Sequence, residues 1–322
     1  RDRIKEPPRG LSEGLISSES KNPLKETFKE LVGLTPFGLI GSDNFKKELS
    51  INIIFTVLIF LASYYLYVLT GDFLQWTAFG IGVYVICNWI HGLKNRDPVA
   101  FLLIFKSKAL LLGLLSFPFI TFVTYALGAF GPSFYIRNFS MTATEVGIIY
   151  GLITVFGSMI GVICGGILGD KLRDTYVNGK LYLIMASAVL TGVTAIGFIH
   201  SENLVASFTW KFVYHIASTA WLGCAASTVT ELVLPRLRAV ASAFFILMLS
   251  MIGLALGPYL TGMVSDIYIN SGLLPGPALK NAMTLTLVVL VLPFGLLAVA
   301  CKYLKSDEAE IYEKARSLGE EI

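Results

Sequence analysis

The stretch GSMIGVICGGILGDKLRD (157–174) places glycine at every fourth position of an apolar run that ends in a cluster of charges. In a helix, Gly157, Gly161, Gly165 and Gly169 lie along one side and let a neighbouring backbone approach closely. An apolar helix that stops at charged residues is typical of a membrane span. The glycine face predicts either static helix packing or a smooth surface along which helices rock, and the charges that follow favour the second.

The composition of the whole chain indicates a membrane protein. Hydrophobic residues make up 55% and charged residues 15% of its 322 residues, whereas soluble domains carry about a quarter charged residues. Apolar stretches that are each suited to cross a bilayer lie at 51–70, 73–92, 107–130, 144–168, 181–200, 207–232, 239–263 and 281–301. Because these runs are continuous rather than alternating, we predict an all-α integral membrane protein.

The basic residues predict the orientation of these spans. Of the 25 Lys and Arg, we place three near the outer side, namely Arg137, Lys211 and Lys280. The excess of basic residues on the other side predicts cytoplasmic N- and C-termini. The same bias accounts for the net charge of +3, so we expect no nucleic-acid surface. The membrane itself is left open between a bacterial inner membrane and a eukaryotic plasma or lysosomal membrane.

The spans and the segments between them suggest five parts. We predict a cytoplasmic linker (1–50) with a stretch suited to rest on the membrane surface, an inserted transmembrane hairpin (51–92), a cytoplasmic loop (93–106), a six-helix bundle (107–303) and a cytoplasmic tail (304–322). The chain opens on Arg1 rather than methionine, so we expect that its beginning is missing. Its four cysteines lack metal or redox spacing, and we predict neither a metal, a cofactor nor an enzymatic activity.

Two stretches resemble a known family. GGILGDKLRD (165–174) resembles the loop signature of the major facilitator superfamily through Gly166, Asp170, Lys171 and Arg173, although Leu172-Arg173 replace its second glycine. ELVLPRLRAVASAFFILMLSMIGLALGPYLTGMVSD (231–266) resembles the fifth helix of a six-helix half in such transporters. That stretch carries Arg236 and Arg238 at its start and Gly253, Gly257 and Pro258 as predicted packing residues. With EPPRG (6–10) and EVGIIYGLITVFG (145–157), the sequence is most similar to the spinster-like branch.

The resemblance implies that the chain is the C-terminal half of a transporter, preceded by the central linker. The N-terminal six-helix half would then be a partner that this sequence does not contain. Secondary transport by alternating access would move an amphiphilic anion, such as a lysophospholipid or sphingoid phosphate, across the bilayer. Residues 51–92 would be an insertion in the linker.

Charges at the predicted cytoplasmic ends form a candidate conformational latch. An acid such as Asp170 suits the positively polarised start of another helix, and Lys171 and Arg173 would tie the loop. The resemblance implies that Arg236 and Arg238 meet the corresponding loop of the absent half, and we expect Glu231 to pair with these arginines. Simple anchoring of basic residues on the inner side is the alternative for Arg173.

The span at 207–232 carries the candidate substrate site. Lys211 and His215 share one helix side, with Tyr214, Ser218 and Thr219 nearby. A cation there would attract an anionic headgroup, and the imidazole could couple transport to protons. In the alternatives, Lys211 extends to the headgroup region and His215 is a hydrogen-bonded packing residue. Phe117, Thr121, Thr124 and Tyr125 would line an acyl chain, unless they are ordinary aromatic and polar residues of a lipid-facing helix.

Two further functions stay open at this stage. Proton-coupled transport of a small organic anion would suit the same fold, although this half offers Lys211 alone as a cavity cation. A membrane scaffold or receptor built on half a transporter would be favoured if the natural chain begins near Arg1.

Overall fold

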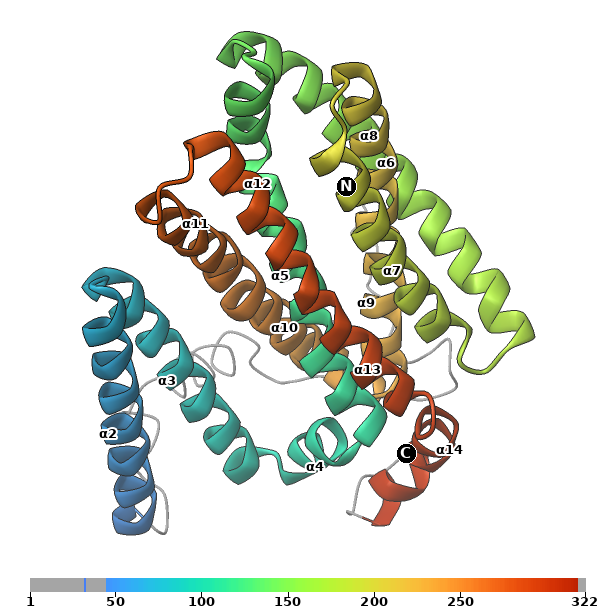
Figure 1. Cartoon of the computed structure of the whole chain (residues 1–322). Coiled ribbons are helices and arrows are strands. Elements are labelled where there is room, and N and C mark those ends of the chain that lie inside the picture. The colour runs from blue at the N-terminus through green and yellow to red at the C-terminus, as the bar shows by residue number, and fades with distance from the viewer. Residues whose placement is uncertain (1–31, 33–44, 318–322) are drawn as a thin grey trace, which may run out of the picture. The chain divides into compact units, whose positions relative to one another are not determined.

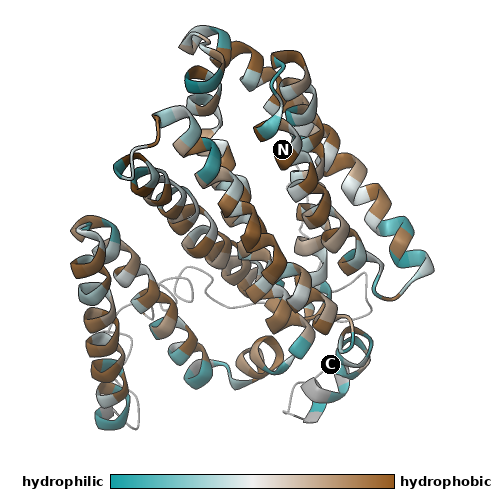
Figure 2. Cartoon of the chain, viewed as in Figure 1, coloured by the Kyte–Doolittle hydropathy of each residue, from teal (hydrophilic) through white to brown (hydrophobic). Residues whose placement is uncertain are grey.

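The computed structural model describes Val32 and residues 45–317, and this part of the chain contains helices and no strand (Figure 1). The predicted linker (1–50) therefore lies largely outside the described residues, as do residues 318–322. Hydrophobic residues run along most helices, whereas hydrophilic ones concentrate near helix ends and in the last helix (Figure 2). Helices of this length and composition confirm the prediction of an all-α, multi-pass membrane protein.

Seven continuous helical stretches in the described part are long and apolar enough to cross a membrane, and two of them, Pro235–Asn270 and Pro275–Ala300, combine α-helical turns with π or 3-10 turns. The predicted span 207–232 is missing from that set because two helices form it, α8 (Leu204–Thr219) and α9 (Trp221–Glu231). Ala220 joins them with helical backbone angles, φ −60° and ψ −28°. The two helices therefore follow one another along the chain, and each alone is too short to span the bilayer.

The described residues fall into two compact units. The first contains residues up to 106, residues 235–237 and residues from 312 onward. Its helices are α2 (Phe45–Thr70), α3 (Phe73–Arg96), α4 (Pro98–Lys106) and the short η3 (Pro235–Leu237). Helix α4 occupies much of the predicted loop 93–106, so that segment is helical rather than irregular.

Helices α2 and α3 form a hairpin that turns at Gly71, whose φ of +81° suits glycine. The outer surface of α2 is apolar and none of its apolar window is buried, which agrees with lipid contact. Polar side chains face inward, however. Asn52 Nδ2 donates to Asn88 Oδ1 at 2.8 Å, and Tyr84 donates to Asn52 Oδ1 at 3.1 Å. His91, for which the sequence suggested no role, pairs with Glu48. Interhelical polar contacts of this kind hold helices together in lipid.

The second unit is built around α5 (Lys108–Phe139), whose apolar window is 67% buried. Helix α5 contacts α10 (Arg238–Met248), η4 (Leu249–Leu254), α11 (Ala255–Asn270), α12 (Pro275–Thr286) and α13 (Val291–Ala300), the last two joined by η5 (Leu287–Leu290). Helix α6 (Ala143–Thr175) packs on α7 (Gly179–His200), α8 and α9. Helix α14 (Leu304–Ser317) follows the last span.

The glycine face of α6 packs directly on α8 and α9. A Cβ atom added to Gly157 would lie 2.7 Å from the Cβ of His215. On Gly161 and Gly165 it would overlap the backbone carbonyl oxygens of Ile216 and Ala220. In this conformation the face is a close packing contact within one unit, whereas rocking of the helices along it stays a prediction. Gly169 packs in the same way against Cys224.

A second set of small residues lies between α5 and the segment η4–α11. A Cβ on Gly253 would overlap the hydroxyl of Thr121, and one on Gly257 would overlap the carbonyl oxygen of Phe122. The six residues of η4 form a π-helix just before Pro258. Because proline has no N–H to donate to the preceding turn, it favours such a local widening of the helix.

Substitution of Gly165 tests this packing. We expect Gly165→Ala to lower the free energy of unfolding by about 1–3 kcal/mol, because the added methyl group must displace the backbone of Ala220. Gly151→Ala is the matched control, since a Cβ at Gly151 meets nothing within 4 Å and alanine favours the helix. Thermal unfolding in detergent measures both variants. Equal melting temperatures for the two would contradict the close contact.

Candidate substrate and gating sites

Lys211 lies in a cage of aromatic rings inside the second unit. Its Nζ atom is 4.2 Å from the ring centroid of Phe198 on α7, 4.3 Å from that of Tyr214 on α8 and 5.0 Å from that of Tyr150 on α6. The side chain is 0% exposed. Its Nζ has no hydrogen-bond partner among the described residues. Three ring faces thus stand where a carboxylate would usually balance an ammonium group.

The cage lies about two turns from the start of α8 rather than at its end. Helix α8 begins at Leu204, so Lys211 is about 10 Å along its axis at 1.5 Å per residue. Tyr135 and Phe208 stack 4.3 Å apart in the same bundle, and Ser207 donates to the carbonyl oxygen of Phe198 at 2.8 Å. Complete burial contradicts the alternative in which Lys211 extends to the headgroup region.

His215 lies one turn further along α8 and faces α6. Its Nε2 is 3.0 Å from the Oγ1 of Thr154, and the side chain is 6% exposed. Its ring meets Tyr150 and Tyr214 edge to face, at centroid distances of 6.0 and 5.3 Å. Gly157 makes this approach possible, because a side chain there would strike His215. In this conformation, His215 therefore has the contacts of a hydrogen-bonded packing residue.

The remaining predicted substrate residues are mostly buried or half-buried. Ser218 is buried, and Thr219 donates to the carbonyl oxygen of Ser158 at 3.2 Å. Phe117 is fully buried between Trp221 and Phe245. Thr121 is buried and Thr124 half-buried, and both donate to carbonyl oxygens of their own helix. Tyr125, at 43% exposed, lies on the surface.

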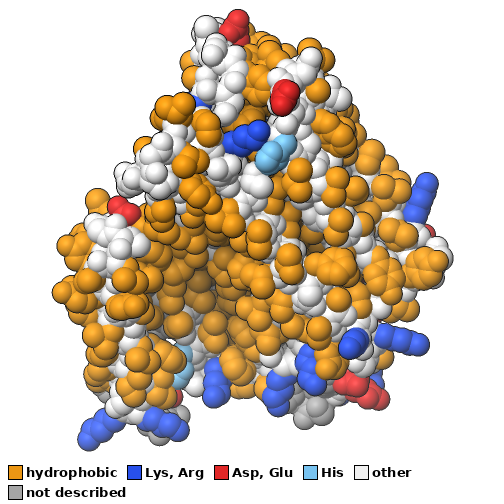
Figure 3. All heavy atoms as spheres, in the orientation of Figure 1, with side chains coloured by type: hydrophobic (Ala, Val, Ile, Leu, Met, Phe, Trp, Pro, Cys, Tyr) orange, Lys and Arg blue, Asp and Glu red, His pale blue; other side chains and the backbone are white. Residues whose placement is uncertain are grey.

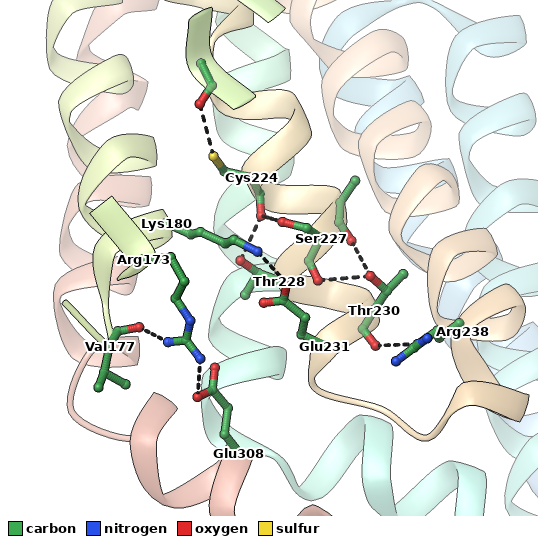
Figure 4. Close-up of polar contacts among 12 residues, drawn as sticks. Arg173, Val177, Lys180, Cys224, Ser227, Thr228, Thr230, Glu231, Arg238 and Glu308 are labelled. Atoms are coloured by element: carbon green, nitrogen blue, oxygen red, sulfur yellow. Dashed lines mark hydrogen bonds and ion pairs between the residues drawn. The ribbon is translucent and has the colours of Figure 1, made fainter. Parts of the chain in front are cut away.

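Two charged residues of the predicted loop signature are exposed, and the third, Arg173, forms hydrogen bonds with its own unit. Asp170 and Lys171 are exposed, and Gly166 has open space around its Cα. Arg173 donates to the carbonyl oxygen of Val177 and, at 2.7 Å, to Oε2 of Glu308 on α14 (Figure 4). The signature arginine is therefore paired within the same unit.

Glu231 does not pair with the arginines that the sequence suggested. Its carboxylate binds Lys180 of α7 instead (Figure 4). The Nε of Arg238 donates to the carbonyl oxygen of Thr230 at 3.2 Å, which satisfies the end of α9. The predicted Glu231–arginine pair was wrong because α7 packs on α9 and its Lys180 reaches the Glu231 carboxylate.

Arg236 is held by a residue that the sequence analysis missed. Its Nη1 donates to Oδ2 of Asp97 at 2.6 Å, and its Nη2 lies 3.4 Å from Oδ1. Asp97 also accepts from the backbone N–H of Ala100 at 2.9 Å and so caps α4. A signal for the cap was present, because Asp97 directly precedes Pro98, a preferred first residue of a helix. Nothing in the sequence indicated its pairing with Arg236.

Comparisons with known proteins agree with this architecture. No family model matches the chain. Over 201 residues it is 30% identical to a protein of Mycolicibacterium smegmatis named MFS-type efflux pump, which covers 62% of this chain and 45% of that protein. Over 173 residues it is 26% identical to Protein spinster of Drosophila melanogaster, covering 50% of this chain and 28% of that one. The chain is therefore similar in sequence to spinster-like proteins of the major facilitator superfamily.

Solved structures show the same fold. A bacterial homologue of the human lysosomal transporter Spinster, in an inward-facing and unoccupied conformation, superposes with a TM-score of 0.51 at 21% identity. The alignment covers 75% of this chain and 59% of that one. The chain spans less than half the length of the two relatives described above.

Replacement of Lys211 tests how the aromatic cage tolerates its charge. We expect Lys211→Met to melt at a higher temperature than the wild type, because it keeps the aliphatic packing and removes a buried ammonium without an acidic partner. Lys302→Met, on an exposed lysine, should melt as the wild type does. Thermal unfolding in one detergent measures both. A lower melting temperature for Lys211→Met would mean that the rings compensate the charge fully.

The Asp97–Arg236 pair predicts a specific pH dependence. Partial burial disfavours ionisation of Asp97, but the hydrogen bonds from Arg236 and from the α4 backbone outweigh it and lower the pKa of this carboxyl. A lowered pKa means that the stabilisation is present above the ordinary pKa of Asp, about 4, and is lost as the pH falls below it. The melting-temperature difference between wild type and Asp97→Asn should therefore stay constant from pH 5 to 8. A step near pH 6 would instead indicate a histidine.

Proposed function

We propose that this chain forms half of a secondary active transporter that moves an amphiphilic anion by alternating access. Similarity to a protein named MFS-type efflux pump and to spinster proteins supports transport as the activity. The observation that carries the anionic substrate is the enclosed ammonium group of Lys211, which lacks an acidic partner in the described part of the second unit. Charged groups within membrane spans are costly and mark substrate or ion pathways.

A phosphate or carboxylate headgroup would supply the counter-charge that Lys211 lacks. The rings of Phe198, Tyr214 and Tyr150 come from three helices, so a shift of one of them would open the cage toward a substrate. His215, one turn away, would donate a second hydrogen bond or exchange a proton with the pathway. A lysophospholipid or a sphingoid phosphate carries such a headgroup on a single apolar chain.

The apolar part of the substrate would lie against α5. Tyr125 is exposed and Thr124 is half-buried on this helix, so both are available to a ligand between the two halves of the transporter. Phe117 and Thr121 are buried in this conformation and would support that surface from behind. The missing counterpart is the N-terminal six-helix half, and both termini of this chain would lie in the cytoplasm.

Flux measurements on the full-length protein in vesicles test this function. Labelled lysophospholipid should cross the membrane with wild-type protein. Flux should fall at least tenfold in Lys211→Met and His215→Ala, because each removes a group that binds the headgroup. Asp170→Asn should keep substrate binding but lose flux, because its exposed carboxylate would act in the latch between halves.

Two controls separate these effects from general damage. His200→Ala removes a histidine that bonds Thr284 outside the cage, and Asp174→Asn removes an exposed acid beside the loop; both should keep flux. Flux of a small organic acid under a proton gradient, with none for lysophospholipid, would overturn the amphiphile and leave the second candidate, in which His215 carries the proton. Absence of any flux would favour the scaffold.

A further inference from the structure

We propose that Asp97 and Glu308 compete with the opposite half for Arg236 and Arg173. These are the two arginines with which this half would close its cytoplasmic gate. The inference rests on the proposed transport function, in which Arg236 and Arg173 lock against the opposite half. It assigns a role to two elements that the transport core does not require: the corner between α3 and α4, which ends the inserted hairpin, and α14, which follows the last span.

Arg236 is engaged by both oxygens of the Asp97 carboxylate. The two contacts, at 2.6 and 3.4 Å, use two nitrogens of the guanidinium, which is the geometry that binds carboxylates best. The Oδ1 atom of Asp97 also accepts from the backbone N–H of Ala100 at 2.9 Å, which is a second hold on the carboxylate besides the arginine. The two side chains are 32% and 30% exposed. An acid from another part of the transporter could therefore reach the same guanidinium.

Arg173 is engaged by an acid whose helix is anchored separately. Helix α14 is fixed by Asp307, which accepts from the hydroxyl of Ser107 at 2.9 Å and from the N–H of Ala109 at 2.8 Å. Leu304 is buried on the same helix. Glu308 is thereby presented to Arg173 at the end of α6, at 2.7 Å. The side chains of this pair are 30% and 22% exposed, so the contact can be exchanged for another.

The other two charged residues of the loop signature, Asp170 and Lys171, have no competing partner of this kind. Asp170 and Lys171 are exposed, and among the described residues neither side chain forms a hydrogen bond or ion pair. A helix of the opposite half can bind Asp170 at no cost to this half, whereas it must displace Glu308 to bind Arg173 and Asp97 to bind Arg236. Both acids therefore disfavour the conformation with the cytoplasmic gate closed.

Distance measurements between spin labels test the competition directly. In the full-length protein, one label replaces Thr175, an exposed residue at the end of α6, and the other lies in the corresponding loop of the opposite half. We expect the double variant Asp97→Asn with Glu308→Gln to increase the short-distance population at least twofold over wild type. Asparagine can still cap α4, so the first substitution removes charge while keeping the helix start.

The controls change acids of the same type that hold no arginine. Asp174→Asn and Glu313→Gln remove exposed acids near the same elements and should leave the distance distribution unchanged, as should the conservative Asp97→Glu. A wild-type distribution in the double variant, or the same shift in the controls, would overturn the proposal. The proposal would also be overturned if the full-length protein contained no opposite six-helix half.

The result is separable from the proposed transport because the distance measurement uses no substrate. A shifted distribution without lysophospholipid flux would uphold the competition and reject the substrate. Normal flux with an unshifted distribution would reject the competition alone.

Discussion

The backbone contact between α6 and the α8–α9 pair is the constraint on which the candidate site depends. Gly157, Gly161 and Gly165 remove the side chains that would hold these helices apart, so carbonyl oxygens and Cα atoms of the two helices meet. This approach brings His215 within reach of Thr154 and places Tyr150 beside Lys211. A wider separation would leave the ammonium group without the third ring of its cage. The close packing of these helices therefore also sets the surroundings of the Lys211 charge.

Several polar and charged side chains of the described helices are satisfied in one of two ways. Near helix ends, acids and bases form pairs, as Lys180 does with Glu231 and Arg173 with Glu308 (Figure 4). Within the hairpin of the first unit, Asn52 and Asn88 bond to each other while apolar side chains face outward. Hydrophobic side chains accordingly cover most of the face shown in Figure 3. Lys211 is satisfied in neither way, and the cost of that exception is the physical reason to connect it with a substrate.

The ion pairs at the helix ends also connect parts of the chain that are far apart in sequence. Asp97 and Arg236 join the hairpin corner to the segment between α9 and α10, and Asp307 caps the start of α5 from the far end of the chain. Such half-exposed pairs add little stability singly. In the gate proposed above, each pair would exchange its partner for another without exposing a buried charge.

The sequence by itself determined the membrane class, most of the helical spans and the resemblance to a family, because continuous hydrophobicity and the signature around Asp170 are local patterns. It also located Gly157, Gly161 and Gly165 on one helix side, since that requires only the helical period. Tertiary structure alone decided what this face meets and where each charge goes. Lys180 rather than an arginine binds Glu231, Asp97 binds Arg236, and Phe198 and Tyr150 surround Lys211. These partners lie on different helices, and helical periodicity fixes the side on which a residue lies but not the helix that packs against it.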